Sequence, residues 1–206
     1  MDFSSTVASQ LYTGAILPES IVILTLIVVL VGDLIVGRAR SGWIPYAAIA
    51  GLLGSVFALY LGWDNPHPVA FLGAFNSDNL SILFRGIIVL STAFTIMMSV
   101  RYVERSGTAL SEFICILLTA TLGGMFLSGA NELVMIFVSL EMLSISSYLL
   151  TGYMKRDPRS NEAALKYLLI GAASSAIFLY GVSLLYGLSG GKTILSEIAL
   201  GFTDPQ

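Results

Sequence analysis

Six long apolar stretches, separated by short polar segments, make up most of this sequence of 206 residues. They lie at 17–36, 43–63, 80–100, 113–129, 133–153 and 163–188. Each is close to the roughly 20 apolar residues that an α-helix needs to cross a hydrocarbon core of about 30 Å. Lipid offers no partner to backbone polar groups, so we expect every stretch to be helical. The pattern therefore predicts an all-α fold, a polytopic bundle of about six transmembrane helices forming a single membrane domain over residues 1–206.

Two shorter segments have patterns of their own. The segment 64–79 is too short to span a membrane and is interrupted by Pro66, Pro68 and Gly73, which predicts a turn or short hairpin. Beyond the sixth apolar stretch, apolar residues recur at helical spacing between Ile194 and Ala199, beside charged residues. This spacing predicts a short helix lying in the membrane interface.

The basic residues predict the orientation of the bundle. Seven of them fall in alternate loops, and the opposite side has only Lys192; the seven are Arg38, Arg40, Arg101, Arg105, Lys155, Arg156 and Arg159. Because positive loops stay on the cytoplasmic side, we expect these loops to face the cytoplasm or stroma. The N-terminus and the 64–79 loop then face the lumen, periplasm or intermembrane space. No positive charge precedes Arg38, so we expect no cleaved signal peptide and a retained N-terminus.

Composition narrows the range of functions. Hydrophobic residues make up 56% of the chain and charged residues only 11%, against about a quarter charged in soluble proteins. The bilayer is therefore a principal partner, and without a basic patch we expect no nucleic acid. The single Cys115 and single His67 cannot form a disulfide, an iron–sulfur cluster or a bis-histidine haem on this chain alone. We expect no catalytic residue, metal or bound cofactor here, and any redox cofactor on another subunit.

Glu141 is the strongest candidate for a functional residue. It lies nine positions after Glu132, roughly 13 Å along the fifth apolar stretch, which places it near the middle of the membrane. An ionisable residue at that depth is costly and is a functional candidate by default. Ser144 and Tyr148 continue a polar stripe from Glu141 toward the cytoplasmic end. The alternative is a protonated glutamate that only fixes helix packing.

Lys166 has two interpretations. It lies about five residues inside the sixth stretch, where its long side chain can reach the headgroups and Glu162 at i−4 offers a local ion pair. Alternatively, if the fifth and sixth helices are antiparallel neighbours, Glu141 and Lys166 differ by only about 7 Å in height, which a lysine side chain nearly spans. Such a pair would link the charge of the lysine to the protonation of the carboxyl group. The sequence leaves both interpretations open.

Two further features have simpler explanations. Arg85 enters its helix from the luminal side, with Asp78 on the same face, so we expect it to snorkel toward the headgroups and keep it only as a possible accessory polar residue. The run of small residues at 171–175 is typical of a helix surface that another helix approaches closely.

The stretch SLEMLSISSYLLTGYMKRDPRSNEAALKYLLIGAASSAIFLYGVSLLYG, at 139–187, resembles the antiporter-like subunits of complex I. It includes both Glu141 and Lys166, and the helix layout of the remaining chain agrees with the same family. Leu140 stands where many members of two antiporter-like subunits have Trp, which favours the subunit 2 type. The segment SYLLTGYMKRDPRSNEAALKYLL is most similar to the cyanobacterial and chloroplast form of subunit 2.

This resemblance implies a subunit that translocates protons while quinone is reduced elsewhere in the complex, with Glu141 and Lys166 on a buried polar axis. It also implies electron flow from NAD(P)H or reduced ferredoxin to plastoquinone in the thylakoid membrane. Iron–sulfur clusters and plastoquinone would be bound through other subunits, and the partners would be the antiporter-like and quinone-site subunits. The family's fold consists of two inverted repeats around broken helices, so we expect this chain to be the N-terminal part of a longer subunit.

Two other functions remain open at this point. The chain could belong to a multi-subunit cation/proton antiporter, a related family with similar buried charges. It could also be a structural scaffold of the membrane arm, in which Glu141 only fixes helix packing. Hydrolysis and group transfer fit poorly, because the sequence has no Cys–His pair, metal-ligand cluster or glycine-rich phosphate loop.

Overall fold

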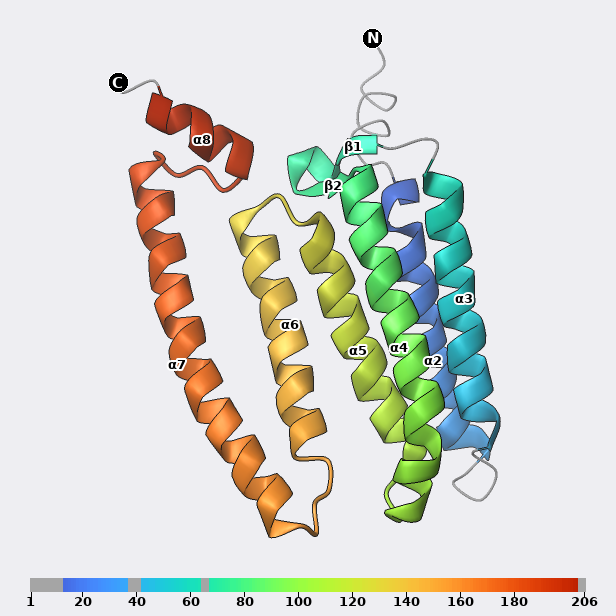
Figure 1. Ribbon diagram of the computed structural model, residues 1–206. Helices are drawn as coiled ribbons and strands as arrows, with labels where there is room; N and C mark the ends of the chain where they lie inside the picture. Colours follow the sequence, from blue (N-terminus) through green and yellow to red (C-terminus); the bar gives the residue numbers. More distant parts are fainter. Residues whose placement is uncertain (1–12, 37–41, 64–66, 204–206) are drawn as a thin grey trace.

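The computed structural model describes residues 13–36, 42–63 and 67–203, and it contains six long helices arranged as a bundle (Figure 1). They are α2 (Leu17–Val36), α3 (Ile44–Gly62), α4 (Asn79–Arg105), α5 (Leu110–Gly129), α6 (Leu133–Thr151) and α7 (Pro158–Leu188). All six are long and apolar enough to cross a membrane. The prediction of an all-α bundle with six transmembrane helices is confirmed.

Two helices extend beyond the apolar stretches at the basic end. α4 continues to Arg105, and α7 begins already at Pro158. The start of α7 has a clear local cause, because proline suits the first helical turn and the Asp157 carboxylate accepts a hydrogen bond from the backbone N–H of Arg159 at 2.9 Å. Hydrophobicity marks only the part of a helix that lies in lipid, so these polar ends lay outside the predicted ranges.

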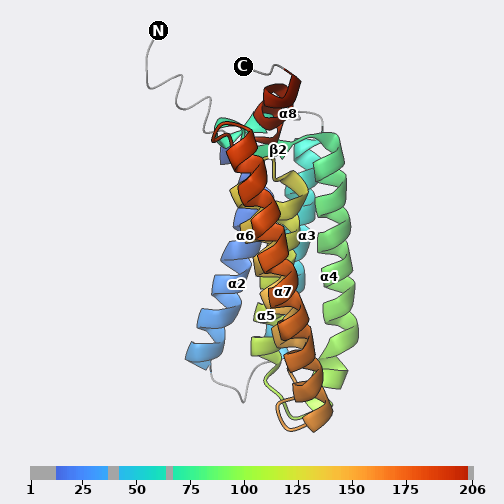
Figure 2. The ribbon, with the colours of Figure 1, turned by 90° about the vertical axis from the view of Figure 1, so that its left-hand side faces the viewer.

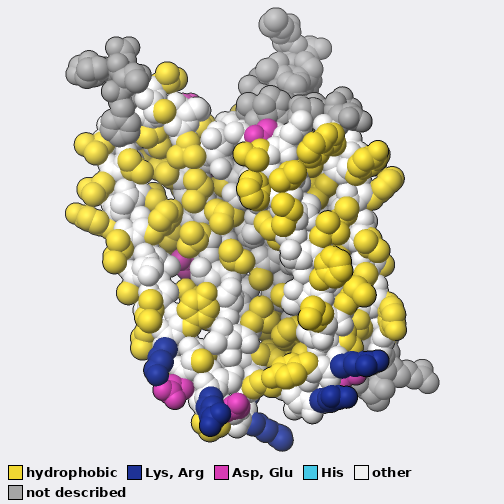
Figure 3. Space-filling model, in the orientation of Figure 1, with side chains coloured by type: hydrophobic (Ala, Val, Ile, Leu, Met, Phe, Trp, Pro, Cys, Tyr) yellow, Lys and Arg dark blue, Asp and Glu magenta, His cyan; other side chains and the backbone are white. Residues whose placement is uncertain are grey.

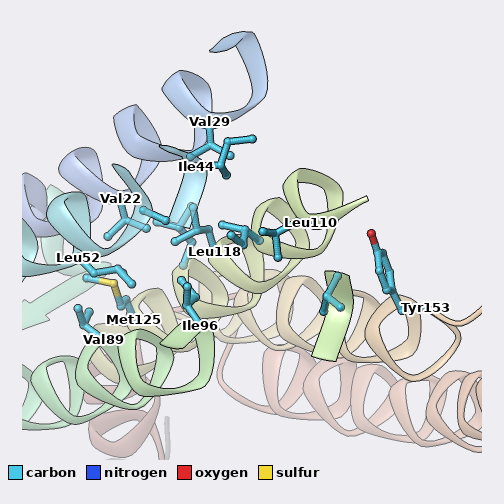
Figure 4. Close-up of a cluster of buried hydrophobic side chains, with 14 residues drawn as sticks. Val22, Val29, Ile44, Leu52, Val89, Ile96, Leu110, Leu118, Met125 and Tyr153 are labelled. Atoms are coloured by element: carbon cyan, nitrogen blue, oxygen red, sulfur yellow. The ribbon is translucent and has the colours of Figure 1, made fainter. Parts of the chain in front are cut away.

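The main hydrophobic core lies among α2, α3, α4 and α5 (Figure 4). α5 contacts each of the other three and also α6. Each of the four helices contributes side chains that are at most 1% exposed, for example Val22, Leu52, Ile96 and Leu118. Shape complementarity, rather than exclusion of water, has to stabilise such a core in lipid. These four helices therefore form the rigid part of the molecule.

α7 is packed much more loosely than the other helices. Its contacts are mainly with α6, and none of its residues is buried. The contacts that do occur involve aromatic residues and glycine. Phe137 stacks on Phe178 with 6.3 Å between ring centroids, and the Tyr148 ring lies across Gly171. α7 lies at the left-hand edge of the bundle in Figure 1 and in front of the other helices in Figure 2. Its outward face is wholly available to lipid or to other polypeptide.

A small cap covers the end of the bundle opposite the basic loops. Strands β1 (His67–Ala70) and β2 (Phe75–Ser77) pair antiparallel around the short 3-10 helix η3 (Phe71–Gly73), which confirms the predicted hairpin. Gly73, at φ +94°, has a backbone conformation that suits glycine. The preceding 3-10 turn η1 (Thr13–Ile16) lies at the same end, next to β1.

The loop before α6 connects this cap to the C-terminal part of the chain. The Asn131 side chain donates to Gly73 O at 2.8 Å, and the Thr193 hydroxyl donates to Glu132 Oε1 at 2.9 Å. The helix predicted after the sixth stretch is present as α8 (Leu195–Thr203). The hairpin and α8 are thus both anchored on the α5–α6 connection.

The surface has one basic end (Figure 3). Hydrophobic side chains cover the flanks, and the Lys and Arg side chains visible in this view gather near the α4–α5 and α6–α7 turns. Five of the seven loop residues predicted to share one side lie at these turns: Arg101, Arg105, Lys155, Arg156 and Arg159. Arg38 and Arg40 lie outside the described residues. The charge asymmetry is therefore present in three dimensions as well as in the sequence.

Candidate functional site

Glu141 occupies the middle of α6. It lies eight residues after Leu133 and ten before Thr151, so roughly 12 Å of helix precede it. Its Oε1 atom accepts a hydrogen bond from the hydroxyl of Ser175 on α7, and the carboxylate is only partly buried. Glu141 therefore lies at the interface between α6 and the loosely packed α7.

The polar stripe predicted on α6 follows Glu141 toward the basic end. Ser144 and Tyr148 lie three and seven residues further on and share its face. The Tyr148 ring makes an edge-to-face contact with Tyr167 at 4.8 Å between centroids. Gly171 leaves the space for this ring, because a Cβ atom there would lie 1.9 Å from the Tyr148 hydroxyl oxygen. Small residues on α7 thus bring hydroxyl groups next to the Glu141 face.

Lys166 is not close to Glu141. Its Nζ atom lies 2.6 Å from Glu162 Oε1, and both side chains are largely exposed. Lys166 and Ser175 are nine residues apart, which is two and a half helical turns and places them on opposite faces of α7. Since Ser175 contacts Glu141, Lys166 points away from it. In the structure Lys166 therefore pairs with Glu162 on its own helix, and Lys166 and Glu141 are not brought together.

The prediction for Arg85 was wrong. Arg85 does not snorkel; it is fully buried, and its Nη1 atom forms an ion pair with Glu19 Oε1 at 3.1 Å. Asp78, which the sequence placed on the same face, instead caps α4 by accepting a hydrogen bond from Ser81 N at 2.9 Å. A guanidinium group has several donors to satisfy, and here they find partners inside the protein rather than in the headgroups.

Each of the three guanidinium nitrogens of Arg85 has a hydrogen-bond partner. It donates to Ala15 O at 3.2 Å, to Ser77 Oγ at 2.7 Å and to Ser81 O at 3.4 Å, and its Cζ atom lies 5.1 Å from the centre of the Phe75 ring. These partners come from η1, from α4 and from strand β2 of the hairpin. The pair therefore joins α2 and α4 to the cap.

Sequence reasoning missed Glu19 as the partner of Arg85. Glu19 lies in the first turn of α2 and is fully buried. A signal was available, because Glu19 and Arg85 each interrupt an apolar stretch close to the same end of the bundle. Nothing in the local pattern, however, indicates that these two side chains, on α2 and α4, meet.

The described part of the chain contains no cluster of three or more His, Cys, Asp or Glu side chains that could hold a metal ion. Cys115, half-buried on α5, is a free thiol. The polar groups that the structure brings together are hydroxyls, carboxylates and one guanidinium. They can exchange protons and balance charge.

Two family models match separate parts of the chain. Residues 5–101 match the N-terminal model of NAD(P)H-quinone oxidoreductase subunit 2, and residues 130–204 match the transmembrane model of NADH:quinone oxidoreductases and Mrp antiporters. The second match contains Glu141, Ser175 and Lys166. It therefore covers the whole candidate site.

Two solved structures have the same arrangement of helices. One chain of respiratory complex I from Thermus thermophilus with bound aureothin superposes with a TM-score of 0.74 and 26% identity, over 91% of this chain and 42% of that chain. A chain of the membrane-bound sulfane sulfur reductase, an archaeal respiratory membrane complex, gives a TM-score of 0.78 at 20% identity, over 90% of this chain and 39% of that one. The second likeness concerns the fold alone.

Relatives in cyanobacteria match almost the entire chain. NAD(P)H-quinone oxidoreductase subunit 2 of Microcystis aeruginosa is 76% identical over 204 residues, which is 99% of this chain and 40% of the relative. The subunit 2 of Nostoc punctiforme is 73% identical over 206 residues, which is 100% of this chain and 38% of the relative. The chain thus spans about two fifths of the length of these relatives. It belongs to the family of NAD(P)H-quinone oxidoreductase subunit 2.

Proposed function

We propose that this chain forms the N-terminal part of a subunit that translocates protons in a complex I-like NAD(P)H or ferredoxin:plastoquinone oxidoreductase. Its contribution to the chemistry is proton transfer through Glu141. The observation that carries this proposal is the place of Glu141, halfway along α6 and hydrogen-bonded to a hydroxyl on a loosely packed neighbour. The quinone and the iron–sulfur clusters belong, in this proposal, to other subunits.

The surroundings of Glu141 suit a residue that exchanges protons. A carboxyl group in the middle of a membrane is costly unless it is neutralised or hydrogen-bonded, which makes it a functional candidate. The Ser175 hydroxyl supplies one such hydrogen bond. Ser144 and Tyr148 place further hydroxyl groups one and two turns closer to the basic end. Protons can move along such a row of hydroxyls when water molecules bridge the gaps.

Lys166 has a less direct role in this proposal. In the conformation described, its ammonium group is neutralised by Glu162 and lies on the face of α7 opposite Ser175. A contribution of Lys166 to proton transfer therefore requires either a rotation of α7 or polar groups beyond this chain. The relatives are about two and a half times as long as the chain, so further helices are available to supply such groups.

We place the protein in the thylakoid membrane, with the basic loops on the cytoplasmic or stromal side and the N-terminus in the lumen. The cyanobacterial relatives support the location, and the gathering of Lys and Arg at one end supports the orientation (Figure 3). The partners are then other membrane subunits of the complex, including antiporter-like and quinone-site subunits.

The test is Glu141→Gln in the full-length subunit, assembled in the complex and reconstituted in vesicles. Proton uptake per quinone reduced should fall by about 100-fold or more at the step that Glu141 serves. Glu104→Gln is a suitable control, because Glu104 is exposed at the basic end of α4. Unchanged proton uptake per quinone in the assembled Glu141→Gln complex would refute the role of Glu141.

One other transport function is favoured by a specific observation. The family model over 130–204 also describes Mrp antiporters. If the full-length subunit co-purified with sodium-transport subunits and without iron–sulfur subunits, the antiporter function would replace the one proposed. A purely structural role predicts another outcome of the same variant: Glu141→Gln would lower the amount of complex but leave the proton-to-quinone ratio intact.

A further inference from the structure

Two cavities of different character adjoin each other at the basic end of the bundle. The first, of about 690 Å³, lies between the α4–α5 and α6–α7 turns. The second, of about 500 Å³, lies where α5, α6 and α7 meet. Glu112, Tyr153 and Lys155 line both of them, so the two share a wall. Each is within the usual size range of a ligand pocket, about 300–1,000 Å³.

The second cavity is apolar and extends into the membrane. Along α6 its lining runs from Gly152 back to Ile145, seven residues or roughly 10 Å deep. Most of the wall consists of aliphatic side chains from all three helices, among them Ile116 on α5 and Leu168 on α7. Two wall residues, Ile145 and Leu165, are still 52% and 57% exposed. The cavity therefore opens sideways, onto a face that lipid or other polypeptide can cover.

The first cavity is more polar and lies at the level where helices end and loops begin. Ser106, Thr108 and the charged residues of the α6–α7 turn line it. Its two acidic groups already have partners, because Glu112 pairs with Lys155 at 3.7 Å and Asp157 caps α7. Arg156 is exposed and has no ion pair among the described residues. The formal charges of these four side chains sum to zero, and Arg156 is the one among them left without a partner in the described part of the chain.

We propose that the two adjoining cavities bind one anionic membrane lipid, with its phosphate or sulfonate headgroup beside Arg156 and an acyl chain between α5, α6 and α7. The order of the two cavities matches the order of headgroup and chain in the cytoplasmic leaflet. A basic side chain between transmembrane helices on that side can hold an anionic headgroup. Tyr148 lines the apolar cavity but Glu141 does not, so the lipid site can be tested apart from the proton-transfer proposal.

The test uses the complete complex, purified in mild detergent from membranes of defined lipid composition. Lipids that remain bound are identified by native mass spectrometry, and the density in the cavity is examined by electron cryo-microscopy. Arg156→Gln should weaken retention of anionic lipid about fivefold, the effect of one basic residue at a membrane surface. Arg105→Gln, also exposed at this end but outside both cavities, should leave retention unchanged.

A second pair of variants tests the apolar half independently of charge. Leu165→Trp puts a large side chain into the cavity and should displace the lipid chain. Ile170→Trp is the matched control, because Ile170 is also exposed but lies about 140° away around α7. The proposal is wrong if Arg156→Gln and Arg105→Gln retain equal amounts of anionic lipid, if Leu165→Trp retains as much as Ile170→Trp, or if the density shows polypeptide in the cavity.

Discussion

Glu19 and Glu141 both lie within helices long and apolar enough to cross a membrane, but their surroundings differ. Glu19 on α2 is fully buried, pairs with a guanidinium group and belongs to a tightly packed four-helix core. Glu141 on α6 is only partly buried, accepts one hydrogen bond from a hydroxyl, and faces a helix with no buried residue. The first carboxylate has a buried charge as its partner, and the second has a neutral hydroxyl group.

Under the proposed function, this difference separates a structural charge from one that takes part in proton transfer. Protonating Glu19 would leave the Arg85 charge buried without its counter-charge, which is strongly unfavourable. Protonating Glu141 leaves no opposite charge stranded, because its observed partner is the neutral Ser175 hydroxyl. A group that gains and loses protons in turn has to tolerate both states. A charged residue inside the membrane is therefore not by itself a sufficient sign of proton transfer. The partner of that residue has to be considered as well.

The largest expected effect comes from breaking the buried pair. Arg85→Met should destabilise the subunit by about 3–5 kcal/mol, because it leaves Glu19 charged and uncompensated. The amount of assembled complex in the membrane measures this loss. The double variant Glu19→Leu/Arg85→Met should recover part of it, since the uncompensated charge is gone. Full assembly of the single variant would show that Glu19 tolerates isolation and would remove the contrast with Glu141.

A second prediction concerns the tight side of α6. A Cβ atom on Gly123 of α5 would lie 2.8 Å from the backbone nitrogen of Leu143 and 3.0 Å from Ser139 O. Gly123→Ala should therefore push α5 and α6 apart, at a cost of about 1–3 kcal/mol in stability. Gly86→Ala is the control, since nothing lies within 4 Å of its added Cβ. Equal thermal stability of the two purified variants would contradict the close α5–α6 packing.

The loose side of α6 should respond differently. Gly171→Ala collides with the Tyr148 ring, but this ring can move, so we expect a stability loss of only about 1 kcal/mol. Its effect on proton translocation should be larger than its effect on assembly, because Tyr148 shares the face of Glu141. Gly181→Ala, on the same helix with open space around it, is the matched control. If both variants pump equally well, the α6–α7 contact is irrelevant to transport.

The smallest effect on stability is expected for Lys166→Gln. Exposed i,i+4 ion pairs contribute only about 0.3–0.5 kcal/mol, and the Lys166–Glu162 pair is largely exposed. The quantity of assembled complex should therefore be unchanged. A clear loss of assembly would mean that Lys166 is buried against other polypeptide in the complete protein. In that case the difference in packing between the four-helix core and α7 would apply only to the described part of the protein.

The sequence predicted the parts of this structure that depend on local pattern. Apolar length predicted the six helices, and the Pro and Gly residues in 64–79 predicted the hairpin. It could not predict which helix packs on which. Glu19 and Arg85 are 66 residues apart, and Glu141 and Ser175 are 34 apart. The estimated height along the helices alone made Lys166 a candidate partner for Glu141. The angular position of each residue around the α7 axis instead places Ser175 next to Glu141.

One experiment tests the distinction between the two carboxylates most directly. It measures protons translocated per quinone reduced in reconstituted complexes that carry Glu141→Gln or the double variant Glu19→Leu/Arg85→Met. The account predicts that Glu141→Gln assembles well and loses proton translocation, whereas the double variant assembles less well and keeps a normal ratio. A normal ratio in Glu141→Gln, together with a reduced ratio in the double variant, would contradict it.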